Sequence, residues 1–306
     1  MPFTTDDARA PVARVWPCLL ALALAACAGD PAPVLPTGAH WLEDRSLTEL
    51  SGLETSPGHA GELWGINDSG SLPRLFRLDE NGRALGRVWV TGAWLHDTES
   101  LASWRDGGNA WLLLGDTGDN RARRESVVVH AVPEPGPGQA SVGIAWSLRL
   151  RFPDGPRDVE GMAVDARSGD LLLVSKRDPV PRFYRVPLSA RDAAAPVTAT
   201  FLASPPAGSV QGAATAMDIS ADGRDLVLLT YTGMYRWQRA AGEDWPQVLA
   251  RPPKALPRPD IHKAEALVLS ATPGRVLVAG ERQPAPLWAG TYDAVEAGAD
   301  ERGGRG

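Results

Sequence analysis

The chain has 306 residues, a formal net charge of −6 and only two cysteines. The charge is mild and dispersed, and no basic run is long enough to follow a nucleic-acid backbone, so we expect no nucleic-acid polymer as a partner. With 11 Trp against 5 Phe, and with 32 Gly and 27 Pro, the composition suits many short strands separated by turns.

Residues 1–26 have the three-part layout of a secretory signal peptide. Arg9 and Arg14 supply a positive start, residues 16–25 form an apolar segment, and small residues precede a cut before Cys27. About ten apolar residues cannot span a hydrocarbon core of ~30 Å, which needs about 20. The segment is therefore predicted to be removed rather than to remain as a membrane helix.

The four residues Leu24-Ala25-Ala26-Cys27 resemble the lipobox of bacterial lipoproteins, in which the cysteine becomes the acylated first residue. The alternative is an ordinary signal with a chance cysteine at that position. The resemblance implies lipidation at Cys27 and an anchor in the cell envelope outside the cytoplasm, on the periplasmic face of the outer membrane, stable when two or more acyl chains are attached. Because Cys18 leaves with the signal, the mature chain can form no intramolecular disulfide, and a packed core must supply its stability.

The remaining chain divides into three parts. Residues 27–39 carry the lipidated cysteine and a Pro-rich tether, and residues 294–306 are a polar, Gly-rich tail that we expect to be frayed. Residues 40–293 are long enough to form one large all-β domain.

Within residues 40–293 one pattern recurs every 48 to 61 residues. Each unit begins with a polar residue, here termed the opener, before a small and an apolar residue. A turn, a strongly apolar strand and an alternating strand follow, and the first four units add a fourth strand, at 85–92, 143–152, 197–203 and 245–252. Four strands per unit of about 50 residues are typical of a β-propeller blade. The openers are Ser51, Glu99, Glu160, Thr215 and Glu265.

The fifth unit lacks a fourth strand, which residues 40–47 could supply from the N-terminal end. Such closure would leave no open sheet edge. We therefore predict an all-β fold, a single five-bladed propeller closed by an N-terminal strand. The alternative is a six-bladed ring with one blade hidden in the longest interval, although loop 133–141 and a long fourth strand account for the extra length there.

The openers are predicted to converge at one end of the central channel, because the innermost strand of each blade lines it. Three carboxylates there would repel one another at low dielectric unless protonated or metal-bound. Carboxylate and hydroxyl oxygens without His or Cys suit Ca²⁺ better than Mg²⁺. The alternative is that each Glu caps a blade end by accepting backbone N–H groups. The candidate metal ligands are Ser51, Glu99, Glu160, Thr215 and Glu265.

Residues that follow the second strand of each unit return to the same face. Cationic groups there, with a bound metal, would attract an anionic ligand. The segments 67–70 and 115–120 can equally be explained as turns. Asp68 and Asp116 are the candidate catalytic residues, as base or water-orienting group. The candidate substrate-binding residues are Asn67, Asn120, Arg123, Lys176, Arg177 and Arg282.

The opener order hydroxyl–Glu–Glu–hydroxyl–Glu and the segment 50–70 are similar to the calcium-activated nucleotidase (apyrase) family. The resemblance implies a five-bladed propeller whose central Ca²⁺ is held by the openers, with Asp68 on the substrate side. Thr215 stands where that family has Ser, and residues 67–70 carry one acid where it has two. The stretch 115–123 looks instead like uncharacterised bacterial secreted propellers.

We therefore expect a monomeric, membrane-anchored Ca²⁺ propeller that hydrolyses a phosphorylated or otherwise anionic small molecule. The alternative is a non-catalytic binding or scaffolding propeller of the cell envelope. No Gly-rich phosphate loop, Ser–His–Asp order or HExxH motif favours an enzyme, and propellers serve both roles.

Overall fold

The computed structural model describes residues 35–68, 70, 73–281 and 283–292. The predicted signal peptide, lipidation site Cys27 and tail lie outside these residues, as does Arg282. In the described part, 22 strands form five sheets, and no helix there is long and apolar enough to cross a membrane.

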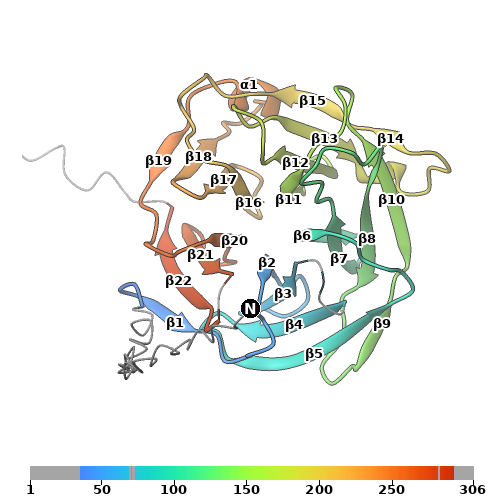
Figure 1. Ribbon diagram of the computed structural model, residues 1–306, viewed down its shortest axis with the longest axis vertical. Helices are drawn as coiled ribbons and strands as arrows, with labels where there is room; N and C mark the ends of the chain where they lie inside the picture. Colours follow the sequence, from blue (N-terminus) through green and yellow to red (C-terminus); the bar gives the residue numbers. More distant parts are fainter. Residues whose placement is uncertain (1–34, 69, 71–72, 282, 293–306) are drawn as a thin grey trace, which may run out of the picture. The chain divides into compact units, whose positions relative to one another are not determined.

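The five sheets are the blades of one propeller (Figure 1). The innermost strands contact one another in ring order, β2 with β6, β6 with β11, β11 with β16, β16 with β20, and β20 with β2. The predicted five-bladed fold is confirmed, and the six-bladed alternative is wrong.

Blade 1 contains β2 (Leu50–Thr55), β3 (Glu62–Asn67), β4 (Arg74–Asp79), β5 (Ala84–Thr91) and β9 (Ser141–Gly143). Blade 2 contains β6 (Thr98–Asp106), β7 (Asn109–Asp116), β8 (Val127–Pro133), β10 (Trp146–Arg151) and β14 (Val197–Thr198). Blade 3 contains β11 (Val159–Asp165), β12 (Asp170–Ser175), β13 (Phe183–Pro187) and β15 (Thr200–Ala203). Blade 4 contains β16 (Ala214–Ile219), β17 (Asp225–Thr230), β18 (Met234–Gln238) and β19 (Lys254–Leu256). Blade 5 contains β20 (Ala264–Leu269), β21 (Arg275–Gly280), β22 (Pro286–Thr291) and β1 (Ala39–Trp41).

The ring closes with the N-terminal strand in the last blade. Strand β1 pairs antiparallel with β22, with Ala39 opposite Trp288 and Trp41 opposite Pro286. Figure 1 shows β1, in blue, beside the red strand β22. The pairing satisfies the outer edge of blade 5 with residues from the start of the domain, as the sequence predicted.

One predicted fourth strand is wrong. Residues 245–252 contain a short helix, α1 (Trp245–Leu249), and the fourth strand of blade 4 is β19. Asp244 caps the helix, its side chain accepting from the N–H of Trp245 at 2.8 Å, and Pro246 lies in the first turn. An acidic cap followed by Pro is a helix-start signal, which outweighs the β-like apolar content of this segment.

Two short strands join neighbouring blades. Strand β9, from the predicted loop 133–141 and its continuation, pairs parallel with β5 of blade 1. Strand β14 pairs parallel with β10 of blade 2, whereas β15, three residues further on, belongs to blade 3. The segment predicted as one strand at 197–203 thus divides between two blades.

Small residues after the openers let the inner strands approach closely. A Cβ on Gly52 would lie 2.7 Å from the backbone nitrogen of Leu101, and one on Gly161 would lie 2.9 Å from Met217 Cβ. The next residue in every blade is apolar and buried, and together these side chains reduce the centre of the channel to a cavity of about 10 Å³, close to the size of one water. They are Leu53, Leu101, Met162, Met217 and Leu267.

Candidate metal centre

Every predicted opener lies at a β-bulge. In each blade the pairing of the inner strand with the second strand skips one residue, and the skipped residue is the opener. A bulge leaves its extra residue unpaired and turns its side chain out of the regular alternation. The five openers are therefore structural equivalents at one end of the channel, here termed the upper end. They are Ser51, Glu99, Glu160, Thr215 and Glu265.

A second repeated contact defines two more equivalent positions. In each blade a backbone N–H just after the second strand donates to a backbone carbonyl just before the inner strand, at 2.8 to 3.1 Å. The donor is the first or second residue after the second strand, and the acceptor lies two residues before the opener. The acceptors are Glu49, Asp97, Asp158, Ala213 and Lys263. The donors, in the same blade order, are Asp68, Gly118, Lys176, Tyr231 and Glu281.

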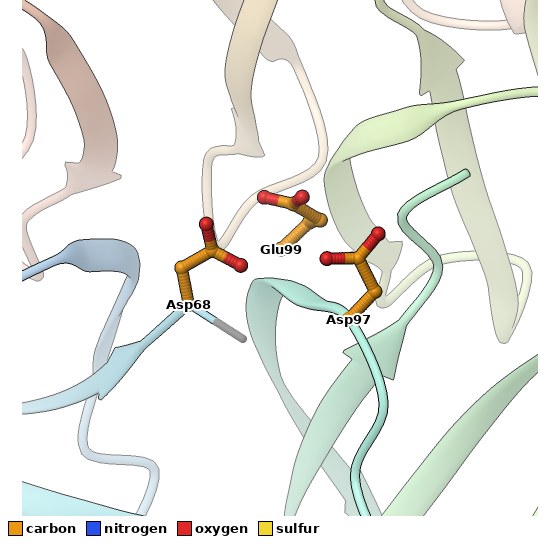
Figure 2. A group of neighbouring side chains, drawn as sticks. All are labelled: Asp68, Asp97 and Glu99. Atoms are coloured by element: carbon orange, nitrogen blue, oxygen red, sulfur yellow. The ribbon is translucent and has the colours of Figure 1, made fainter. Parts of the chain in front are cut away.

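Acidic side chains from these positions gather over blades 1 to 3. One carboxylate oxygen each from Asp68, Asp97 and Glu99 lies within 4.8 Å of the others, and so does one each from Glu99, Asp158 and Glu160. Glu99 belongs to both groups, and the five residues are here termed the acidic cluster. Figure 2 shows the carboxylates of Asp68, Asp97 and Glu99 turned toward a common space.

A glycine makes room for this arrangement. A Cβ on Gly118 would lie 2.8 Å from Glu99 Oε1 and closer still to Asp97 Oδ2. Any larger residue would have to displace the two carboxylates. The glycine thus lets the carboxylates of Asp97 and Glu99 pack against its backbone, and the cluster has the hard oxygen donors that a Ca²⁺ ion requires.

The environment of Glu99 disfavours its charged form. Burial, together with the neighbouring charges of Glu160, Asp68 and Asp97, raises the pKa of Glu99 to about 10, although Lys176 opposes the shift. Its only hydrogen-bond donor in the described chain is the hydroxyl of Ser51, at 3.1 Å. Without a cation, Glu99 therefore holds a proton at neutral pH.

Glu160 is compensated by the chain itself. Burial raises the pKa of Glu160 to about 8, although the ammonium of Lys176 donates to its Oε1 atom and opposes the shift. Burial alone would lower the pKa of Lys176, but the contact with Glu160 outweighs it and the pKa lies above its ordinary value. The same ammonium lies 5.1 Å over the ring of Tyr231, whose hydroxyl donates to Glu265 Oε1.

The predicted alternative, in which the Glu openers cap backbone N–H groups, is wrong for the described chain. The carboxylates of Glu99, Glu160 and Glu265 accept there only from side chains. The hydroxyl openers do bind backbone: Ser51 Oγ donates to the Glu99 carbonyl at 3.0 Å, and Thr215 Oγ1 to the Ala264 carbonyl at 2.9 Å. They tie adjacent blades together.

Asp116, the second candidate catalytic residue, lies outside the acidic cluster. Its Oδ1 atom accepts from Arg124 at 2.8 Å and from the Asp97 N–H at 3.2 Å, and its Oδ2 atom accepts from the His96 N–H at 3.0 Å. Asp116 therefore fixes the loop that carries Asp97.

Two of the candidate substrate-binding residues contact each other at the edge of the acidic cluster. Arg177 donates through Nε to Asp158 Oδ2 at 2.5 Å and through its terminal nitrogen to Asn120 Oδ1. Lys176, the neighbouring residue, reaches Glu160 instead. These three polar groups surround the cluster on its blade 3 side.

The other candidates are less closely linked to the cluster. Asn67 is buried and donates through Nδ2 to the carbonyl of Ser46 at 2.8 Å. The side chain of Arg123 is exposed, and its backbone N–H donates to Asp119 Oδ1 at 2.9 Å. Arg282 lies outside the described residues.

The structure adds Asp97 and Asp158 to the predicted ligands. Both stand two residues before a Glu opener, so blades 2 and 3 share a D-x-E pattern at 97–99 and 158–160. This repeat is visible in the sequence. It indicates a site shared by the two blades only when the β-bulges show that the openers lie at equivalent positions. Gly118 and Tyr231 carry no comparable sequence signal.

Comparisons with known proteins bear on the fold alone. No protein-family model matches the sequence, and no curated protein matches it. Similar solved structures include the Cps50 (Swd1) β-propeller domain of Myceliophteria thermophila, with 12% identity and a TM-score of 0.43 over 79% of this chain and 84% of that one. The Dos1 propeller has 13% identity and a TM-score of 0.39 over 76% of this chain and 53% of that one. The class of protein follows from the blade topology itself: the chain is a five-bladed β-propeller.

Proposed function

We propose that this protein is a membrane-anchored, extracytoplasmic propeller that binds Ca²⁺ at the upper end of its channel and hydrolyses a phosphorylated or otherwise anionic small molecule there. The observation that carries the proposal is the acidic cluster. Its central residue, Glu99, is buried among carboxylates and receives no backbone hydrogen bond in the described chain. A divalent cation would replace the proton that this arrangement otherwise requires.

Asp68, Asp97 and Glu99 are the residues that would hold the ion. When bound, Ca²⁺ supplies positive charge that polarises a ligand oxygen. Among the three, Glu99 is the most buried, whereas Asp68 and Asp97 are half-buried and nearer to solvent.

Residues of the chain itself would accept a proton from water and bind the charge of the ligand. Asp68 is the candidate base that takes a proton from water, because it lies at the solvent side of the cluster. Arg177, half-exposed beside Asp158, would bind negative charge on the ligand. Since apolar side chains fill the channel below the openers, the ligand would enter from the upper end alone.

The predicted anchor agrees with this choice of metal. Lipid on Cys27 would leave only about a dozen residues before β1, which keeps the propeller close to the membrane. Export would place the site where Ca²⁺ reaches ~10⁻⁴–10⁻³ M, the range of weak extracellular sites. The partners would be the membrane and an anionic small molecule.

The second candidate function is a non-catalytic binding or scaffolding propeller. It is favoured by the contacts of Lys176 with Glu160 and of Tyr231 with Glu265. Through these contacts the chain itself neutralises part of the opener ring, as expected of a ring that only joins blades.

Calorimetric titration and thermal melting with Ca²⁺, Mg²⁺ or a chelator test the metal site. We expect Ca²⁺ to raise the melting temperature, Glu99→Gln to reduce that rise, and Asp222→Asn, in an exposed turn of blade 4, to leave it unchanged. Absence of Ca²⁺ binding would refute the site. Hydrolysis of nucleotides and of p-nitrophenyl phosphate then separates the two functions: Ca²⁺ binding without turnover of any phosphoester favours the non-catalytic propeller.

A further inference from the structure

The upper face changes its charge around the ring. At the position two residues before the opener, blades 2 and 3 carry Asp97 and Asp158, whereas blade 5 carries Lys263. These positions accept equivalent backbone hydrogen bonds, so the change of residue changes the charge presented at this level of the ring. The acidic cluster therefore occupies one side of the face, and a basic group occupies the other.

A pocket of about 490 Å³ lies on the basic side. It is formed between the end of β17 and the loop that leads into β20, and it adjoins the opener ring through Tyr231, whose hydroxyl donates to Glu265. The lining residues are Tyr231, Arg258, Asp260, Ile261, His262 and Lys263.

Arg258 is the best-placed cation in this pocket. Its two terminal nitrogens donate to the carbonyls of Pro259 at 3.0 Å and Ile261 at 2.9 Å, which fixes the guanidinium against its own loop. In the described chain its Nε atom is buried without a hydrogen-bond partner. Burial lowers the pKa of Arg258, and Asp260 only partly opposes this. An anion beside it would supply the missing compensation.

Lys263 is held in an unusual backbone conformation, with φ of 49°. A non-glycine residue in this left-handed region is strained, and such residues cluster at ligand sites. Its ammonium lies 2.6 Å from Glu281 Oε2, which keeps the side chain at the mouth of the pocket.

We propose that this pocket binds the oxyanion of the small-molecule ligand, a phosphate or carboxylate group. Arg258 and Lys263 supply the positive charge, and His262 supplies a hydrogen bond, whereas the hydroxyl of Tyr231 is already used on Glu265. The inference rests on the proposed function for the remainder of the ligand, which would reach the acidic cluster across Tyr231. Binding of the oxyanion itself needs no metal.

The test is a calorimetric titration of the full chain in detergent with inorganic phosphate, and separately with acetate, each with and without Ca²⁺. We expect Arg258→Gln to weaken binding of at least one oxyanion by about tenfold or more, and Arg149→Gln on the outer edge of blade 2 to leave it unchanged. Because Arg258 also supports its loop, melting temperatures are compared, and Lys263→Gln, which leaves those loop contacts in place, should weaken binding in the same direction.

The outcomes separate this proposal from the proposed function. If neither oxyanion binds, or if both variants bind like the wild type, the pocket is not an oxyanion site even when Ca²⁺ still binds. If phosphate or acetate binding depends on Arg258 while Ca²⁺ binding is absent, the pocket is supported and the metal site fails. A preference for phosphate over acetate, or the reverse, identifies which group the ligand carries.

Discussion

The two ends of the channel both contain buried carboxylates, but those carboxylates face different partners. At the lower end, Glu54 and Asp218 lie three residues after the openers of blades 1 and 4 and line a cavity of about 320 Å³. Glu54 accepts from the backbone N–H of Ser103 in blade 2 at 3.2 Å, and Asp218 from that of Leu269 in blade 5 at 2.7 Å. Burial and then the charge of Glu54 raise the pKa of Asp218, so the two lower carboxylates also interact. At the upper end, Glu99 lies among carboxylates and accepts from no backbone N–H in the described chain.

Because the buried carboxylates at the two ends have different hydrogen-bond donors, burial alone does not identify a functional carboxylate. The lower pair is held by fixed N–H dipoles that join one blade to the next, so its removal should affect stability. In the acidic cluster, Glu99 and Glu160 accept from no backbone N–H in the described chain. Lys176 compensates Glu160, so Glu99 is the residue whose natural partner is a bound cation. The predictions below test this contrast.

The largest expected effect is a loss of stability as the pH rises in the absence of metal. Burial raises the pKa of Glu54 from 4.5 to about 7, and that of Glu160 to about 8 and Glu99 to about 10. The folded state therefore holds protons that the unfolded state releases near pH 4.5, so stability present at low pH is lost as the pH rises through these values. Glu54 alone would account for roughly 3 kcal/mol of this loss.

Urea denaturation in chelator from pH 5 to about pH 9 measures this loss, since the titrations lie in that window. Glu54→Gln should flatten the profile near neutral pH. Ca²⁺ should flatten it at higher pH only, because the ion binds the ionised acidic cluster. Parallel profiles with and without Ca²⁺ would contradict the assignment of the metal to the upper end.

Asp218→Ala is expected to destabilise the protein by about 2–4 kcal/mol, because the buried N–H groups of Ile219 and Leu269 lose their acceptor. The loss should be the same with Ca²⁺ and with chelator. Asp222→Ala, in an exposed turn, is the control and should change the midpoint of urea denaturation little. A Ca²⁺-dependent loss for Asp218→Ala would show that the two ends are coupled.

Glu99→Gln should give the opposite pattern. The amide is neutral without taking up a proton, whereas Glu99 must be protonated in the metal-free protein, so the metal-free variant should keep or gain stability. Its Ca²⁺ affinity should fall by about tenfold to a hundredfold, or ~1.4–2.7 kcal/mol. Calorimetric titration and chelator melting curves provide the two measurements. Unchanged Ca²⁺ affinity would remove Glu99 from the site.

The sequence predicted the ring more fully than the site. The repeat of opener, small residue and apolar residue predicted the position of all five inner strands. It recurs because every inner strand has a bulge at its opener and places an apolar side chain in the channel two residues later. Helix α1 was missed because its cap, Asp244, and Pro246 are local signals that a repeat-based alignment of blades overrides.

The partners of the openers could not be predicted, because they come from other blades or from other loops. The contact of Lys176 with Glu160 lies within one blade, but that of Tyr231 with Glu265 joins blades 4 and 5. Gly118 illustrates the limit: its need for space arises only where Asp97 and Glu99 converge. Asp116 was predicted to be catalytic from its position after a strand, yet both of its oxygens are used to hold a loop.

The smallest expected effect concerns Thr215, which the sequence grouped with the metal ligands. Its hydroxyl donates to the carbonyl of Ala264, so Thr215→Val should cost about 1 kcal/mol by leaving that carbonyl without its donor. If the hydroxyl only joins blades 4 and 5, as its contact indicates, Ca²⁺ affinity should not change. Ser51→Ala is the matched comparison, because Ser51 Oγ donates to the carboxylate of Glu99 as well as to its carbonyl. It should lose a similar amount of stability and also alter Ca²⁺ affinity, so equal metal responses of the two variants would show that the hydroxyl openers have one role and not two.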